Sequence, residues 1–586
     1  MKNLKTQLAL LLLATLSWFT VAYGQVIPRR YAAARNKTTP VQSLSAKSEP
    51  MVQEQETVLY SFTGADGASP QAALIRDGEG NLYGTTAFGG LDSSYCQFYC
   101  GVVFKLDKAG NETVLYSFTG GADGLSPFGG LVRDDEGNLF GTTTGGGSAS
   151  LPAGTVFKLE PPAQPGGTWT ETVLHSFCSA ANCTDGNTPY VGVIRDDKGN
   201  LYGTTVGGGE GCTDYGGCGV VFKLDRKGNE TVLYSFCPTG GYGNCTDGQS
   251  PNAVIQDAAG DLYGTTEYGG GDLASCGGGC GVVFKLAPPA QAGGAWTETV
   301  LYSFTGGTDG GEPFASVIQD AAGNLYGTTS GGGDPACSLN YFPGCGVVFK
   351  LAPPAQAGGA WTETVLYSFT GGTDGGYPVG GVIQDAADNL YGTTLFGGLD
   401  SSYCSFDCGV VFKLDTAGNE TALYSFTGLA DGNNPYSGLI QDAAGNLYGT
   451  TGYGGDFSGT FCQGNTGCGV VFKVASAGVS VTPTSLNFGN VGLGHRAKQV
   501  VTLENQGIDS VEIGPITFTA ITGDVSQFSD HVFCQANLGA GKSCTIAVIF
   551  TPDAVGADAA TLNIVTSAPG SPVEVPIAAA GIEKGK

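Results

Sequence analysis

Short hydrophobic segments alternate with turns rich in Gly, Asp and Asn along most of this chain, and the alternation recurs at a nearly fixed interval. The clearest marker is the segment GNLYGTT at residues 80–86. Six near-copies follow, spaced 57 to 65 residues apart, and begin at Gly137, Gly199, Gly260, Gly323, Asp388 and Gly445. A period of this length indicates tandem structural units, so it decides the fold class before any single motif does.

Each repeat holds four strand-like segments bounded by turn residues. In the first repeat they are ETVLYSF (56–62), AALIRD (72–77), NLYGTT (81–86) and GVVFKL (101–106), all rich in β-branched or aromatic residues. Four short strands per repeat without helices are typical of propeller blades, whereas a β-solenoid, the alternative, usually has shorter coils without hairpins. The sequence therefore predicts an all-β chain with a seven-bladed β-propeller over residues 56–475.

The connections predict the order of strands in each blade. Tight turns containing Gly join AALIRD to NLYGTT, and GVVFKL to the next ETVLYSF, so ETVLYSF becomes the outer strand. The array begins on ETVLYSF and ends on GVVFKV at 469–474. We therefore expect residues 56–62 to pair with 470–474 and close the ring. GNLYGTT then builds the ring, and we expect its Gly and Thr residues to allow close packing between neighbouring sheets.

Beyond residue 478 the repeat is absent. Segments such as LNFGNV and ATLNIVTS alternate over about seven short strands, which predicts an immunoglobulin-like β-sandwich over 478–586. At the other end, Lys2 and Lys5, an apolar run at 8–13 and a small-residue site before Gln25 predict a signal peptide over 1–24, with a retained membrane anchor as the alternative. Residues 25–55 resemble a flexible leader, and no later stretch is apolar enough to span a membrane.

The cysteines support an oxidising compartment, so we expect a secreted protein, extracellular or at the cell surface, with the periplasm as a further possibility. An even number in close pairs behind a signal peptide indicates disulfides. Zinc is the alternative, but neither a CxxC spacing nor a neighbouring His supports it. Eight of the nine pairs fall in the longer loops of one face of the predicted ring. The pairs are Cys96/Cys100, Cys178/Cys183, Cys212/Cys218, Cys237/Cys245, Cys276/Cys280, Cys337/Cys345, Cys404/Cys408, Cys462/Cys468 and Cys534/Cys544.

The formal net charge is −26, and it becomes −28 without the signal peptide because that segment holds two Lys and no acidic residue. Such a surface repels nucleic acid, so we expect no nucleic-acid partner. The same negative charge would also attract cations, which is the more specific interpretation.

The repeat, with DxxGNLYGTT and GVVFKLD, resembles that of the bacterial choice-of-anchor extracellular proteins (GloVer or NxxGxxT type), and its D-x-x-G-N-L-Y core is similar to the NHL propeller repeat. The C-terminal segments LNFGNV, LENQG and FTPDAVG resemble the Hydin-like (ASPM/SPD/Hydin) immunoglobulin-like domain. These resemblances imply a location and an architecture but no activity. The chain shows no LPxTG motif or hydrophobic sorting tail, so they do not predict how the protein is anchored.

Two Asp residues recur in every repeat. The first ends the inner strand, where we expect it to fix the tight turn: Asp77, Asp134, Asp196, Asp257, Asp320, Asp385 and Asp442. The second lies in loops near the predicted central opening: Asp66, Asp123, Asp185, Asp247, Asp309, Asp374 and Asp431. Seven carboxylates would bind Ca²⁺ if their oxygens converged, although Asp-Gly is also an ordinary turn dipeptide.

The sequence gives catalysis little support. No GxSxG motif, sialidase-type Asp box or cofactor loop is present. His175 replaces Tyr in an ETVLYSF strand and is expected to be packed there, as Trp169, Trp296 and Trp361 are expected to pack on their own hairpins. An acid pair for glycoside hydrolysis would have to come from Glu210, Asp214, Glu267, Asp272, Glu312 and Asp334.

We therefore expect a non-catalytic binding or scaffold protein whose ligand, a polysaccharide or a protein, binds the disulfide-braced loop face. A carbohydrate-active hydrolase or lyase and a purely structural envelope protein are the alternatives. The sequence predicts neither the oligomeric state nor the identity of the ligand.

Overall fold

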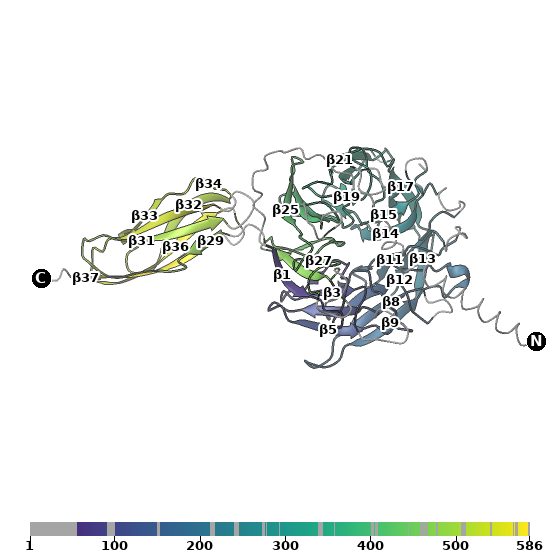
Figure 1. The fold of residues 1–586 in the computed structure, drawn as a ribbon, viewed down its shortest axis with the longest axis horizontal. Helices are drawn as coiled ribbons and strands as arrows, with labels where there is room; N and C mark the ends of the chain where they lie inside the picture. Colours follow the sequence, from purple (N-terminus) through teal and green to yellow (C-terminus); the bar gives the residue numbers. More distant parts are fainter. Residues whose placement is uncertain are drawn as a thin grey trace, which may run out of the picture. The chain divides into compact units, whose positions relative to one another are not determined.

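The computed structural model describes residues 56–583 except 91–99, 149–152, 211–216, 239–244, 272–275, 277, 292, 338–343, 357, 400–403, 405–407, 444, 458–461, 463–466, 476–478, 506–510, 540–541, 567 and 569–571. The predicted signal peptide and leader therefore lie outside the described residues. The described elements are strands, apart from two three-residue 3₁₀ turns, η1 (Ala181–Cys183) and η2 (Val525–Gln527) (Figure 1).

The repeats form seven four-stranded antiparallel sheets, which we number in chain order. The strands of each are given in hydrogen-bonding order, from the edge strand predicted to be the inner one to the edge strand predicted to be the outer one. Sheets one to three are β2 (Ile75–Arg76), β3 (Leu82–Thr86), β4 (Val102–Leu106), β5 (Glu112–Ser117); β6 (Val132–Arg133), β7 (Leu139–Thr143), β8 (Thr155–Glu160), β9 (Thr170–Ser176); and β10 (Ile194–Arg195), β11 (Leu201–Thr205), β12 (Val220–Leu224), β13 (Glu230–Ser235). Sheets four and five are β14 (Gln249–Gln256), β15 (Leu262–Tyr268), β16 (Val282–Ala287), β17 (Thr297–Ser303); and β18 (Ile318–Gln319), β19 (Leu325–Thr329), β20 (Val347–Ala352), β21 (Thr362–Ser368). Sheets six and seven are β22 (Ile383–Gln384), β23 (Leu390–Thr394), β24 (Val410–Leu414), β25 (Glu420–Ser425); and β26 (Ile440–Gln441), β27 (Leu447–Thr451), β28 (Val470–Val474), β1 (Glu56–Ser61).

Sheet seven contains the first strand of the array. β1 pairs antiparallel with β28, from Glu56 opposite Val474 to Ser61 opposite Val470. The predicted pairing of the two ends is therefore present. This pairing gives hydrogen-bond partners to the edge of β28, which would otherwise be unpaired because the last repeat has no outer strand of its own.

The first recurring Asp fixes the tight turn after each inner strand, as predicted. Asp77 Oδ1 accepts hydrogen bonds from the backbone N–H groups of Glu79 and Asn81 at 3.0 and 2.9 Å, and Oδ2 accepts from the Asn81 amide and the Tyr83 hydroxyl. Burial opposes ionisation of Asp77, but these hydrogen bonds outweigh it and lower the pKa of the carboxyl group. The turn and the second strand are thus tied together at each repeat.

The motif GNLYGTT has two packing roles. A Cβ atom on Gly84 would lie 2.6 Å from the Phe104 ring, so Gly makes room for the aromatic ring of the third strand in its own sheet. The first Thr reaches the next sheet, because Thr85 Oγ1 donates to the Gly129 carbonyl at 3.1 Å. The prediction of contacts between sheets thus holds for Thr, whereas the close contact of Gly is within one sheet.

Seven aromatic pairs join each sheet to the next and close a cycle. In each pair, the Phe after one outer strand meets the Phe of the third strand in the following sheet, edge-to-face, with 5.0 to 5.2 Å between ring centroids. Phe62 of sheet seven meets Phe104 of sheet one in this way. The pairs are Phe62/Phe104, Phe118/Phe157, Phe177/Phe222, Phe236/Phe284, Phe304/Phe349, Phe369/Phe412 and Phe426/Phe472. Their rings are buried, so the hydrophobic cores lie between neighbouring sheets.

The inner strands are shorter than predicted, except in sheet four. β2 covers only Ile75–Arg76 of the predicted 72–77, and a separate bridge joins Ala68 to Phe88. In contrast, β14 is continuous over eight residues. Repeat four has one residue fewer between its Pro and the following apolar residue, so its chain runs straight into the strand.

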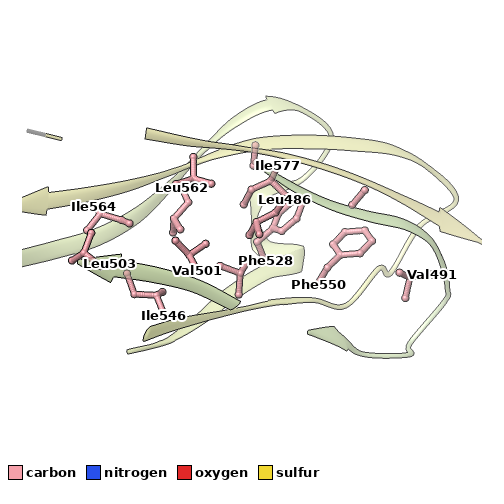
Figure 2. Packing of buried hydrophobic residues seen from close by; sticks show 14 of the residues in the cluster. Leu486, Val491, Val501, Leu503, Phe528, Ile546, Phe550, Leu562, Ile564 and Ile577 are labelled. Atoms are coloured by element: carbon pink, nitrogen blue, oxygen red, sulfur yellow. The ribbon is translucent and has the colours of Figure 1, made fainter. Parts of the chain in front are cut away.

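The C-terminal region forms two sheets around one core (Figure 2). Val501, Phe528, Ile546, Phe550 and Leu562 lie in this core and are almost fully buried. The Cys534–Cys544 disulfide links the segment after β33 to β35, two paired strands. Nine described strands replace the expected seven or so: β29 (Val479–Thr482), β31 (Ala497–Asn505), β35 (Ser543–Phe550) and β33 (Phe528–Val532) in one sheet, and β30 (Leu486–Gly492), β37 (Val573–Ile582), β36 (Gly556–Thr566), β32 (Val511–Thr522) and β34 (Asn537–Leu538) in the other.

Candidate functional site

The second recurring Asp holds the loop that follows each outer strand. Asp66 accepts hydrogen bonds from the Thr63 N–H at 2.8 Å, the Thr63 hydroxyl at 2.9 Å and the Tyr60 hydroxyl at 2.5 Å. Asp123, Asp309, Asp374 and Asp431 make the same contacts with their own Thr and Tyr residues. Asp247 accepts instead from Tyr234 and the Cys237 N–H, and Asp185 from Ser179.

These carboxylates do not gather around one point. Among the described residues, the only three acidic, His or Cys side chains with ligand atoms mutually within 4.8 Å are Cys218, Cys237 and Cys245. All three sulfurs are in disulfides, which makes them poor metal ligands. The hydrogen bonds of the second Asp set therefore support the loop-fixing role that the Asp-Gly alternative implies.

His175 keeps the place of the Tyr that it replaces. Its ring packs on Phe177, with 4.8 Å between centroids, and Nε2 lies 3.6 Å from Asp185 Oδ2. It is thus a packed strand residue that contacts the Asp of its own loop.

A Glu is the first or second residue of each outer strand and lies near the Asp of the preceding sheet's loop. Burial first, and the charge of Asp66 second, raise the pKa of Glu112 to about 7. Its Oε1 is buried without a hydrogen-bond partner among the described residues. The six equivalent residues also have an unpartnered Oε1 and a pKa raised to about 7 or about 8: Glu56, Glu171, Glu230, Glu298, Glu363 and Glu420.

Two sequence positions differ from repeat to repeat, although the residues around them recur. The residue after the Pro that precedes the inner strand is Gln71, Phe128, Tyr190, Asn252, Phe314, Val379 or Tyr436. The second residue after GTT is Phe88, Gly145, Gly207, Tyr268, Gly331, Phe396 or Tyr453. In every sheet the latter pairs with the residue two before that Pro, so both positions lie at the same end of the inner strand.

Three aromatic side chains from this end of the sheets are in contact. Phe128 stacks on Tyr190 with 4.9 Å between centroids, and Phe88 meets Phe128 edge-on at 5.9 Å. Burial raises the pKa of Tyr190, and the electrostatic effect of Glu267 and Tyr453 raises it further. Tyr190 precedes sheet three and Tyr453 follows β27 of sheet seven, so groups from sheets that are not neighbours in the cycle act on one another here.

We call Phe88, Phe128, Tyr190, Glu267 and Tyr453 the axial cluster. All five residues keep part of their surface exposed. Aromatic rings, two hydroxyls and one carboxylate have the composition of a small-ligand site.

Sequence reasoning missed the aromatic members of this cluster and listed Glu267 only as a candidate catalytic acid. A comparison of one position across the seven repeats would have found them, because Phe128 and Tyr190 stand where other repeats have Gln71, Asn252 or Val379.

The other acids proposed for catalysis have local contacts or lie outside the described residues. Asp334 Oδ1 accepts from the Ala336 N–H, and the Glu210 backbone N–H donates to Ser235. Glu312 is a loop residue with a left-handed backbone (φ 55°). Asp214 and Asp272 are outside the described residues.

The Trp residues pack inward and do not form a binding patch. Trp169, Trp296 and Trp361 each pack against a buried cluster that includes a neighbouring sheet. The Trp361 ring, for example, lies 6.5 Å from that of Tyr263 in β15 of sheet four. The expected packing on their own hairpins is therefore only part of their role.

Seven of the nine expected cysteine pairs are disulfide-bonded between described residues: Cys178–Cys183, Cys237–Cys245, Cys276–Cys280, Cys337–Cys345, Cys404–Cys408, Cys462–Cys468 and Cys534–Cys544. Cys100 and Cys218 are also in disulfides, but their expected partners, Cys96 and Cys212, lie outside the described residues. The part of the chain that the structure describes contains no helix long and apolar enough to cross a membrane. Disulfides at this density fit an extracellular protein.

One set of loop cysteines is deeply buried, which their place in the longer loops did not predict. The residue before the Gly that leads into the third strand is at most 2% exposed in six repeats: Cys100, Cys218, Cys280, Cys345, Cys408 and Cys468. Each is buried because its backbone joins two sheets. The Cys100 carbonyl accepts a hydrogen bond from the Ser126 N–H of the next repeat at 2.8 Å, and the Cys280 carbonyl accepts one from Glu312 at 2.8 Å.

The same carbonyl contact recurs at the other four positions, with N–H donors from Ser250, Tyr377, Asn434 and Ser69 to Cys218, Cys345, Cys408 and Cys468. The backbone of each of these cysteines therefore lies at the junction between neighbouring sheets. Each bridge ties its long loop to the buried core and not only to another part of the loop.

The Gloeobacter/Verrucomicrobia repeat model matches residues 47–272, 180–341, 239–462 and 338–507. These matches span most of the chain, which therefore belongs to this family of tandem-repeat proteins. The C-terminal region matches the TMEM131-like N-terminal model over residues 479–566, in place of the expected Hydin-like domain.

No curated protein matches the chain. Among solved structures, a glucose dehydrogenase is similar at 12% identity over 72% of this chain and 100% of that one, with a TM-score of 0.34. PapD-like domain 7 of human CEP192 is 16% identical over 19% of this chain and 89% of that one, with a TM-score of 0.16. The secreted serine protease VesC from Vibrio cholerae is 14% identical over 21% of this chain and 30% of that one, with a TM-score of 0.17.

Proposed function

We propose that residues 56–475 form a seven-bladed β-propeller, that residues 478–586 form an immunoglobulin-like sandwich, and that the protein is a secreted or cell-surface binding protein without catalytic activity. The seven four-stranded sheets, the seven Phe pairs that close their cycle and the pairing of β1 with β28 support the propeller. The two sheets of the C-terminal region around one core support the sandwich. The disulfides support secretion.

One observation carries the binding role: the rings of Phe88, Phe128 and Tyr190, from three successive sheets, are in contact and stay partly exposed. The cluster varies between repeats, whereas the groups that build the sheets recur. It also lies at the end of the sheets from which the long, disulfide-braced loops extend. A polysaccharide or a protein is the ligand class that we propose for this face.

The test is to incubate the purified full chain with a panel of polysaccharides and secreted proteins, with and without Ca²⁺. We expect retention of at least one ligand and no release of saccharide fragments. Fragment release would contradict the non-catalytic proposal and favour a hydrolase or lyase. Retention of nothing on the panel would favour a purely structural protein.

A further inference from the structure

We propose that the axial cluster is a carbohydrate-binding site that takes an uncharged sugar ring, packed against the aromatic rings of Phe88, Phe128 and Tyr190. This inference rests on the proposed binding function and narrows its ligand to one class. Four features of the molecule support it: the aromatic rings, the polar groups, the size of the cluster and the repeat pattern.

The aromatic rings of the cluster are in continuous contact, and because Phe128 and Tyr190 stack on each other, they leave their outer faces and edges for a ligand. Phe88, Phe128 and Tyr190 come from three successive sheets, and their rings are in contact at 5.9 and 4.9 Å. All three residues are partly exposed. The C–H face of a sugar ring is apolar and its rim is polar, so it matches a wall of aromatic rings beside a few fixed polar groups.

The polar part of the cluster suits hydroxyl groups. The Glu267 carboxylate accepts hydrogen bonds, whereas the hydroxyls of Tyr190 and Tyr453 both donate and accept. Glu267 precedes Tyr268, which pairs with Gln249, so it lies at the same end of its sheet as the aromatic positions, and its charge acts on Tyr190. A carboxylate in a chain of net charge −26 repels anionic saccharides such as polyuronates or sulfated glycans, so the site favours an uncharged sugar.

The size of the cluster favours a sugar over a protein surface. A stable protein partner needs about 800 Å² of surface on each side. Five half-buried side chains are better matched to one or two sugar units.

The fold does not require aromatic residues at these positions. Repeats one, four and six have Gln71, Asn252 and Val379 at the position of Phe128 and Tyr190, and their sheets form equally well. The two aromatic rings therefore need an explanation other than packing. The same comparison supplies substitutions that the repeats already tolerate.

The test uses the full chain and two variants that copy repeat six, Phe128→Val and Tyr190→Val, together with Glu267→Gln. Phe533→Ala is the control, because Phe533 is an aromatic residue of the C-terminal region with 61% of its surface exposed. Affinity for neutral polysaccharides, polyuronates and sulfated polysaccharides is measured by affinity electrophoresis. Thermal unfolding of each variant checks that the sheets are intact.

We expect the native chain to bind at least one neutral polysaccharide more tightly than any anionic one. Each Val variant should lose about tenfold in affinity, the loss of one aromatic stacking contact, at an unchanged unfolding temperature. Glu267→Gln should weaken neutral binding, and Phe533→Ala should leave it unchanged.

Equal affinity of the native chain and the Val variants for a neutral polysaccharide would overturn this site while leaving the proposed binding function in place. Preference for anionic polysaccharides, or retention of secreted proteins but of no saccharide, would overturn the ligand class. Retention of nothing at all would overturn the proposed function as well.

Discussion

Thr204 is the one exception in an otherwise regular series of hydroxyl contacts between sheets. The first Thr of GTT donates to a carbonyl of the next sheet in six repeats, as Thr328 does to the Gly380 carbonyl at 3.0 Å. Thr204 Oγ1 is buried without a partner among the described residues. Repeat four lacks one residue after Pro251, so the accepting carbonyl is displaced.

This exception predicts different effects for two identical substitutions. Thr328→Val removes a buried hydrogen bond and should destabilise the repeat region by about 1 kcal/mol. Thr204→Val removes a hydroxyl that has no partner, so it should be neutral or stabilising. Differential scanning calorimetry of both variants measures this. A larger loss of stability for Thr204→Val than for Thr328→Val would contradict the assigned contacts.

At the scale of elements, the closing strand β1 is the only strand of its sheet that comes from the far end of the repeat array. Val58 lies in β1 opposite Phe472 of β28. Val58→Pro introduces a residue that cannot donate to the ladder and should lower the unfolding temperature of the repeat region by several degrees.

The matched control for the closing strand is Val481→Pro in β29 of the C-terminal region. It should leave the repeat region's transition unchanged. An unchanged transition in Val58→Pro itself, with the repeat region still compact by small-angle X-ray scattering, would show that closure by β1 is dispensable.

The outer strands also predict how stability depends on pH. The seven Glu residues at the start of the outer strands have pKa values raised by burial and by the neighbouring Asp. These values are about 7 or about 8, above the ordinary value of 4.5. The folded state thus holds protons that the unfolded state releases between about pH 4.5 and 8, so stability falls as pH rises through this window. Below it, turn residues such as Asp77, whose pKa is lowered, become protonated and cost stability.

We therefore expect the repeat region to unfold at a higher temperature at pH 5 than at pH 8. Replacing Glu298, Glu363 and Glu420 together by Gln should reduce the difference, because Gln cannot ionise. Glu574→Gln, at an exposed position of β37, is the control. A melting temperature that rises from pH 5 to pH 8 would contradict this assignment of the raised pKa values.

For the molecule as a whole, sequence periodicity predicted the structural features that recur in every repeat. The strand order, the pairing of 56–62 with 470–474 and the turn role of Asp77 all depend on local patterns that appear seven times. The axial cluster does not, because Phe88, Phe128 and Tyr190 lie in three different repeats and come into contact only in the folded cycle. The interaction of Glu112 with Asp66, and its equivalents in the other repeats, were not predicted for the same reason, because each such pair joins two repeats. The burial of cysteines such as Cys100 was missed likewise, because the contact that buries it comes from Ser126 of the next repeat.

We infer that the seven sheets surround an axial site for an uncharged sugar. A crystal structure of the full chain with an oligosaccharide from a retained neutral polysaccharide would show where the sugar binds. We predict a sugar ring against Phe128 and Tyr190, with a hydroxyl group in hydrogen-bond range of Glu267. An oligosaccharide bound only elsewhere, with the axial cluster empty, would contradict the claim.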